Sequence, residues 1–242
     1  MSYELRPVAK VARGATYLFV QGILSSMVGV AYFTVLSNPL VNPHALSTSE
    51  MGVFALLSFL VTLGPTLGAL ALPSASVKYI AHYLGLGQRR MARSVVSRVL
   101  QVALIVSAGF SVLTFATASW LASGLFGASS ATSLLPPLAM CVFFAILYTY
   151  AMGFLQGLQR MREIAILTLM FSVVGRMLAI YLLLLGWGLM GVVAGWLFGY
   201  AAASIGGVLL TARFLGLFER PHPVSYTHLR AHETEADLVC RL

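Results

Sequence analysis

The chain has 242 residues, of which 59% are hydrophobic and 9% are charged, and its formal net charge at pH 7 is +8. Soluble domains typically carry about a quarter charged residues, so this chain has too little polar surface to cover a water-soluble globule. The composition therefore excludes an ordinary soluble protein and indicates a chain that lies in a lipid bilayer.

Six stretches are long and apolar enough to cross a bilayer, which takes about 20 residues in a helix. None of them shows the strict alternation of a barrel strand, so we predict an all-α integral membrane protein. The predicted spans are Gly14–Leu36, Gly52–Leu72, Val95–Leu121, Leu134–Leu158, Ile164–Leu185 and Leu189–Ala212.

The basic residues that flank these spans follow a simple alternation. They precede the first span, lie around the second and fourth connections and follow the sixth span, whereas the first, third and fifth connections contain none. Loops rich in Lys and Arg stay on the cytoplasmic side, so we predict a multi-pass protein of the cytoplasmic membrane with both ends of the six-helix unit inside. The flanking residues are Arg6, Lys10, Arg13, Lys78, Arg89, Arg90, Arg93, Arg98, Arg160, Arg162, Arg213 and Arg220.

Glycine recurs at every fourth residue in two of the spans. Such faces let helix backbones approach closely, so we expect contacts between helices of the same chain, with a dimer interface as the alternative. Two prolines, Pro65 and Pro73, predict that the second span bends or ends there. The glycines are Gly64 and Gly68 in the second span and Gly191, Gly195 and Gly199 in the sixth.

Acidic residues are scarce, and none lies within a span. The spans therefore offer no carboxylate pair for acid/base catalysis and no acidic cluster for a divalent metal, and the scattered histidines lack ligand spacing. We expect no enzyme activity, no cofactor, no metal and no nucleic-acid partner, and we favour a conduit or a carrier. The acids before the C-terminal tail are Glu4, Glu50, Glu163 and Glu219.

One charged residue, Arg176, lies near the middle of the fifth span. An arginine there costs roughly 2.5–3.5 kcal/mol on insertion scales. The nearest acid on that helix, Glu163, directly precedes the span and is thirteen residues away, or about 20 Å along a helix. One interpretation is that Arg176 faces a hydrated cavity and binds an anionic substrate, since a guanidinium group suits phosphate well. The other is that it bonds to backbone carbonyls or pairs with an acid elsewhere.

Further polar residues are candidates for substrate binding. Lys78 and His82 lie one helical turn apart after the second span; they could receive a lipid-linked phosphate at the inner leaflet or form an interfacial elbow against anionic head groups. Polar side chains in the first and fourth spans could line the Arg176 cavity or make hydrogen bonds between helices. These are Gln21, Ser25 and Ser26 in the first span and Gln156 in the fourth.

Several stretches in this order resemble a known family. They are "RGATYLF", "SEMGVFALL", "LPSASVKYIAHYLGLG", "FLQGLQRMRE" and, after the arginine of the fifth span, "GWGLMGVVAGWLFGY". Together, over about residues 13–213, they resemble the N-terminal half of a polysaccharide-biosynthesis flippase of the multidrug, oligosaccharidyl-lipid and polysaccharide exporter superfamily. The first connection, "LSNPLVNPHALSTSE", is longer than is usual in that family.

The resemblance implies one lobe of a two-lobe alternating-access transporter. Its partners would be membrane lipid, a C-terminal lobe of the same chain, and an oligosaccharide on a polyprenyl phosphate or pyrophosphate carrier as substrate. Cavity arginines are typical of the family, and Arg176 matches in kind and place. A cation-coupled multidrug exporter of the same superfamily and a non-transporting glycosyltransferase or accessory membrane protein are the alternatives.

The C-terminal stretch "VSYTHLRAHETEADLVCRL" differs in composition from the rest of the chain. Written as codons, it resembles a translated transposase-type sequencing adapter. We therefore expect residues 1–222 to be the native six-helix lobe, residues 223–242 to be a non-native tail, and the second lobe to lie in further sequence.

Overall fold

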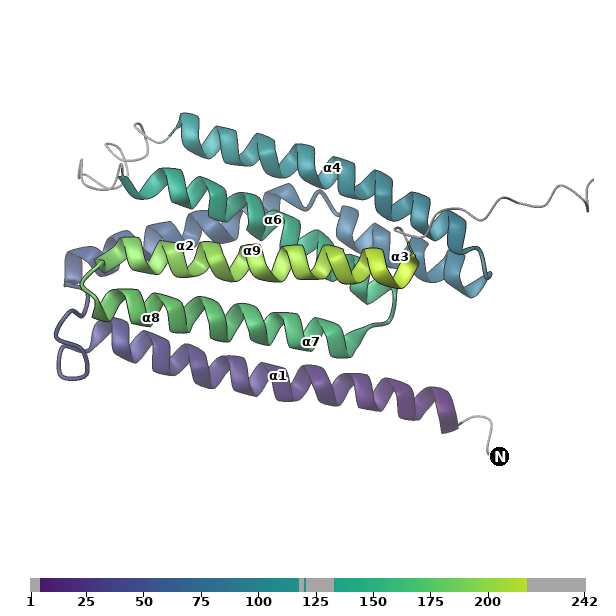
Figure 1. Cartoon of the computed structure of the whole chain (residues 1–242), viewed down its shortest axis with the longest axis horizontal. Coiled ribbons are helices and arrows are strands. Elements are labelled where there is room, and N and C mark those ends of the chain that lie inside the picture. The colour runs from purple at the N-terminus through teal and green to yellow at the C-terminus, as the bar shows by residue number, and fades with distance from the viewer. Residues whose placement is uncertain (1–4, 118–119, 121–132, 217–242) are drawn as a thin grey trace, which may run out of the picture.

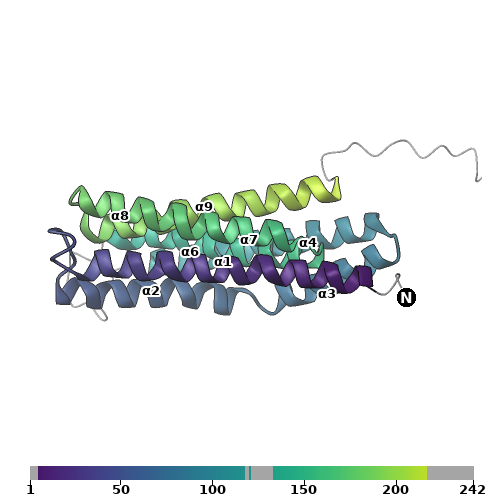
Figure 2. The ribbon, with the colours of Figure 1, turned by 90° about the horizontal axis from the view of Figure 1, so that it is seen from below.

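The computed structural model describes residues 5–117, 120 and 133–216, and these form helices with no strand among them (Figure 1). The helices run antiparallel along one long axis in both views (Figures 1 and 2). In chain order they are α1 (Leu5–Ser37), α2 (Thr48–Gly68), α3 (Leu72–Gly85), α4 (Arg89–Ala116), α6 (Leu135–Gly157), α7 (Met161–Met170), the π-helical turn η2 (Phe171–Gly175), α8 (Arg176–Leu184) and α9 (Gly188–Leu215).

Six of the described helices are long and apolar enough to cross a membrane, which confirms the predicted number of spans. The fifth span is one continuous helix made of α7, η2 and α8. The first and third helices begin earlier than predicted, at Leu5 and Arg89. The predicted tail, residues 223–242, lies outside the described residues.

The connections alternate between the two ends of the bundle. The α1–α2 and α8–α9 connections lie at one end in Figure 1, and the α3–α4 and α6–α7 connections lie at the other, where α1 begins and α9 ends. The connections rich in Lys and Arg therefore share one end, as the charge pattern requires. That this end faces the cytoplasm remains a prediction from the positive-inside rule.

Helix α6 forms the centre of the bundle and packs against α2, α3, α4 and α9. Its buried residues include Tyr150, Phe154 and Cys141, which are fully inaccessible. Helix α1 is the most exposed span: it packs mainly against the fifth span and lies at the lower edge of the bundle in Figure 1. One face of α1 is therefore open along most of its length.

The glycine faces make contacts within the chain, as expected. A Cβ on Gly195 would lie 2.5 Å from the Gly175 carbonyl oxygen, and a Cβ on Gly199 would lie 3.0 Å from the Gly175 Cα. In the same way Gly64 faces Val142 of α6. The absence of side chains lets the backbone of α9 approach the backbone of the fifth span, and lets side chains of α6 pack against the backbone of α2.

The second span breaks between α2 and α3, which confirms the prediction from its prolines. It ends at Gly68, earlier than the predicted Leu72, because Leu70 and Ala71 take left-handed backbone angles of φ 48° and 57°. The break leaves carbonyls at the end of α2 without helical partners. The Tyr150 hydroxyl lies 3.0 Å from the Gly68 oxygen and 3.1 Å from the Ala69 oxygen, so its proton is shared between them.

Candidate functional site

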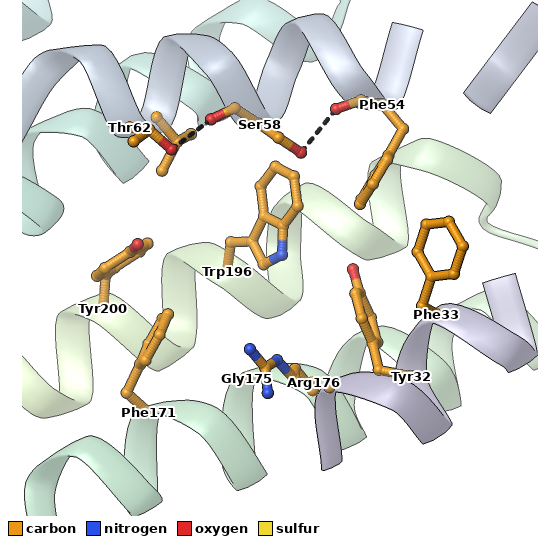
Figure 3. A pocket seen from close by; sticks show the side chains of 12 residues that line it. Tyr32, Phe33, Phe54, Ser58, Thr62, Phe171, Gly175, Arg176, Trp196 and Tyr200 are labelled. Carbon is orange, nitrogen blue, oxygen red and sulfur yellow. Dashed lines mark hydrogen bonds between the residues drawn. The ribbon is translucent and has the colours of Figure 1, made fainter. Parts of the chain in front are cut away.

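A pocket of about 360 Å³ lies between α1, α2, the fifth span and α9 (Figure 3). The helices that form it come from the first, second, fifth and sixth spans, so the pocket depends on the packing of these four spans. Its lining combines one cation with several hydroxyl and aromatic groups. The non-aromatic polar residues in the lining are Ser58, Thr62 and Arg176.

Six of the twelve residues that line the pocket are aromatic. Phe54 lies 5.4 Å from Trp196, and Phe171 lies 4.3 Å from Tyr200, centroid to centroid. Tyr32 and Phe33 complete the wall from α1. Such rings present flat apolar faces and, in tyrosine and tryptophan, a polar edge. The wall can therefore hold a ligand that is partly apolar and partly polar.

Arg176 lies at the base of this pocket, close to Phe171 and Tyr32 in Figure 3. Its Nη1 donates to the Ser25 carbonyl oxygen of α1 at 2.7 Å and to the Ser172 Oγ, one turn earlier on its own helix, at 2.8 Å. Both sequence interpretations are therefore partly met: the guanidinium group bonds to a backbone carbonyl and also lines a pocket.

No acidic side chain of the described residues balances this charge. The ion pair that the described residues do form joins Arg160 and Glu163 at 3.8 Å, at the end of the bundle where α7 begins. Arg176 is half-buried within a span, where an unpaired charge is costly. The pocket is therefore electrostatically suited to an anionic group.

Tyr32 places a second polar group in the pocket. Its hydroxyl is buried and faces the indole of Trp196 (Figure 3), and no other residue that the structure describes forms a hydrogen bond with it. A buried hydroxyl without a partner is uncommon. Tyr32 therefore contributes a buried hydroxyl to the pocket wall beside Trp196.

The predicted polar residues of α1 divide into two groups. Ser25 reaches Arg176 through its carbonyl, and the Ser25 Oγ accepts a hydrogen bond from Gln21 Nε2 at 3.3 Å. Ser26 is exposed and donates to the Gly22 carbonyl of its own helix. Gln21 and Ser25 thus lie on the face of α1 that meets Arg176, and Ser26 lies away from it.

The other predicted site residues lie apart from this pocket. Lys78 and His82 are exposed on α3. Gln156 is also exposed and lines a separate pocket of about 380 Å³, together with Pro73, Ser74 and other residues of α3 and α6. The structure therefore does not bring Gln156, Lys78 or His82 together with Arg176. In the described ranges there is no group of three or more His, Cys, Asp or Glu that could hold a metal ion.

Sequence reasoning missed the aromatic wall and the partner Ser172. Two signals could have found them. Ser172 lies four residues before Arg176, where side chains on a helix meet. Trp196 and Tyr200 lie one turn apart, each directly after a glycine that faces the fifth span.

The sequence model of the family described as polysaccharide biosynthesis protein matches residues 11–229. The chain belongs to this family. It is a multi-pass membrane member, with six apolar helices among its described residues. No curated protein matches the chain significantly.

Two solved structures share the fold of this polysaccharide biosynthesis family member. One is a multidrug resistance MATE family transporter of the MOP superfamily in an outward-facing conformation, with a TM-score of 0.63, 17% identity and 85% of the present chain covered. The other is a MOP superfamily transporter from Pyrococcus furiosus, described as having a binding pocket of reverse polarity, with a TM-score of 0.61, 18% identity and 84% coverage. The chain spans 44% of the length of each.

Proposed function

We propose that this chain forms one lobe of a transporter that flips lipid-linked oligosaccharide across the cytoplasmic membrane for polysaccharide or surface-glycan biosynthesis. The carrier would be a polyprenyl phosphate or pyrophosphate. Family membership supports the link to polysaccharide biosynthesis, and the likeness to half of two transporter structures supports the two-lobe arrangement. That the protein catalyses no reaction stays a prediction.

The observation that carries the proposal is Arg176 in an aromatic pocket in the middle of a span. A flippase must move a charged phosphate and a polar sugar past the apolar core of the bilayer. A guanidinium group compensates the phosphate charge, and ring faces such as those of Trp196 and Tyr200 can cover the apolar face of a sugar ring. The prenyl chain would remain in the lipid.

Lys78 and His82 belong to the proposal as an initial contact. Both are exposed on α3, which lies at the end of the bundle with the basic connections. Exposed cations at a membrane surface attract anionic lipid head groups. They would concentrate the phosphorylated carrier at the inner leaflet before its head group enters the pocket. The alternative is that this segment lies at the membrane surface and its cations contact ordinary anionic head groups.

A multidrug exporter is the alternative suggested by one of the two related structures. Such exporters usually couple to cations through a membrane carboxylate, and the described part of the spans has none in its interior. A cationic drug would also be repelled by Arg176 in this pocket. The pocket therefore favours an anionic substrate.

The test is translocation of a fluorescent polyprenyl-diphosphate oligosaccharide in proteoliposomes containing the complete protein that the gene encodes. Arg176→Ala is expected to lower the rate at least tenfold, because the loss of a charged hydrogen-bonding partner typically costs more than one hydrogen bond. Arg98→Ala is the matched control, since it removes the same charge from an exposed position on α4. Equal rates for the two variants would contradict the proposal.

A further inference from the structure

A single π-helical turn, Phe171–Gly175, directly precedes Arg176 and interrupts the α-helical fifth span. Such turns are rare and are frequent at functional sites. This one contains Ser172, which is 2% exposed and whose Oγ accepts a hydrogen bond from Arg176 Nη1 at 2.8 Å. The turn therefore buries a polar side chain directly against the pocket arginine.

Gly29 of α1 lets the backbone of α1 come close to the Arg176 guanidinium group. A Cβ at this position would contact the guanidinium group, at 3.2 Å from Arg176 Nη1, 3.6 Å from its Cζ and 3.7 Å from its Nη2. Because Gly29 has no side chain, the backbone of α1 comes close enough for the Ser25 carbonyl to accept a 2.7 Å bond from Nη1.

The donors of Arg176 are thus divided unequally. A guanidinium group carries five N–H donors. The two on Nη1 are directed to Ser25 and Ser172, while Nε and Nη2 have no acceptor among the residues that the structure describes. Nε–H and one Nη2–H are parallel and match two oxygens of one phosphate or carboxylate group. One bidentate edge of Arg176 is therefore free.

We propose that Ser172 and Gly29 are positioning residues that present the Nε–Nη2 edge of Arg176 to a single oxyanion attached to a sugar ring. This deepens the proposed function and rests on it. The pocket volume, about 360 Å³, is near the lower end of the range of small-molecule sites, ~300–1,000 Å³. The pocket takes the oxyanion and the adjoining ring, and the rest of the oligosaccharide lies outside it.

The oxyanion has two possible sources, the phosphate of the carrier linkage and the carboxylate of an acidic sugar. Glucose 1-phosphate and glucuronic acid represent them as probes, and glucose is the uncharged control. Trp196 reports binding by its fluorescence once every other tryptophan of the complete protein, Trp120 and Trp187 of this chain included, is replaced by phenylalanine. Saturable binding of either charged probe, tighter than that of glucose, supports the proposal and identifies the source. Binding of neither overturns it.

The positioning role is tested by variants in this single-tryptophan background. Ser172→Ala is expected to weaken binding of the charged probe about tenfold, as for the loss of one hydrogen bond, and Ser172→Thr to restore it because the hydroxyl returns. Arg176→Lys keeps the charge but loses the fork, so adding Ser172→Ala to it should cause little further loss. Gly29→Val should also weaken binding.

The matched control is Ser107→Ala, which removes another buried serine hydroxyl, on α4 and outside the pocket. It is expected to bind the probe like the parent protein. If the losses from Ser172→Ala and Arg176→Lys multiply, Ser172 acts independently of Arg176 and the positioning role is wrong. If Arg176→Ala itself binds the probe normally, the proposed function fails as well, so the two failures can be told apart.

Discussion

Replacing Gly195 by alanine should push α9 away from the fifth span and lower the thermal stability of the protein. The new Cβ would lie 2.6 Å from the Ala179 Cβ, 2.7 Å from the Ala179 nitrogen and 2.5 Å from the Gly175 oxygen. Ordinary contact begins near 3.4 Å, so the helices must separate by about 0.8 Å for the Cβ pair alone. Two of the three contacts are backbone atoms, which cannot rotate away.

The size of the effect follows from the cost of overpacking, typically about 1–3 kcal/mol. On the scaling for a chain of this size, roughly 2–4 °C per kcal/mol, the melting temperature should fall by about 2–12 °C. The control is Gly22→Ala, because a Cβ on Gly22 meets nothing within 4 Å. Alanine also favours a helix over glycine by up to about 1 kcal/mol, so this control should be neutral or slightly stabilising.

The assay uses a thiol-reactive fluorogenic dye during heating in detergent. Cys141 is fully buried and becomes reactive on unfolding, and every other cysteine of the protein, Cys240 of this chain included, is replaced by serine in every variant. If Gly195→Ala melts at the same temperature as Gly22→Ala, the backbone contact between α9 and the fifth span is not as close as described, and the reasoning is refuted.

Two further predictions concern the helix break and the orientation. Tyr150→Phe removes the hydroxyl that lies between the Gly68 and Ala69 oxygens. The Ala69 oxygen keeps the Leu72 N–H as a donor at 3.0 Å, so the Gly68 oxygen is the one left unpaired, and the melting temperature should fall in the same assay by the equivalent of about 1–3 kcal/mol. An unchanged melting temperature would contradict a stabilising role of the Tyr150–Gly68 bond. Lys78 belongs to α3 and Leu40 to the α1–α2 connection, elements that lie at opposite ends of the bundle, and both residues are exposed. Cysteines introduced at these positions should react with a membrane-impermeant reagent from the inner and outer face respectively, and the reverse pattern would contradict the predicted orientation.

The spans and their alternation were predictable because both are local properties of the sequence. Hydropathy defines each span, and the flanking charges define which connections share an end. The break after α2 was also predictable, since Pro65 and Pro73 lie on either side of it. What was less accurate was its position, because the left-handed angles at Leu70 and Ala71 leave no residue-type signature.

The site was predictable in part. Arg176 stands out because a charge within a span is rare, but its partner Ser25 is 151 residues away and bonds through a carbonyl that any residue would supply. Gln156 lines another pocket than Arg176, and the sequence could not show this because polarity within a span does not indicate which neighbouring helix the side chain faces. The π turn could not be predicted, since it differs from an α-helix in its backbone hydrogen bonds and not in the types of residue it contains.

The π turn also has a consequence for how related sequences align with this one. A π-helical turn has hydrogen bonds between residues five apart and therefore holds one residue more than an α-helical turn. The α-helical segments before and after it still present the same faces to their neighbouring helices. A relative with a regular fifth helix should therefore lack one residue between Met170 and Arg176 if the faces on both sides are to keep their neighbours. A one-residue gap at this place in an alignment would separate the lineages that inherited this arginine pocket from those that share only the fold.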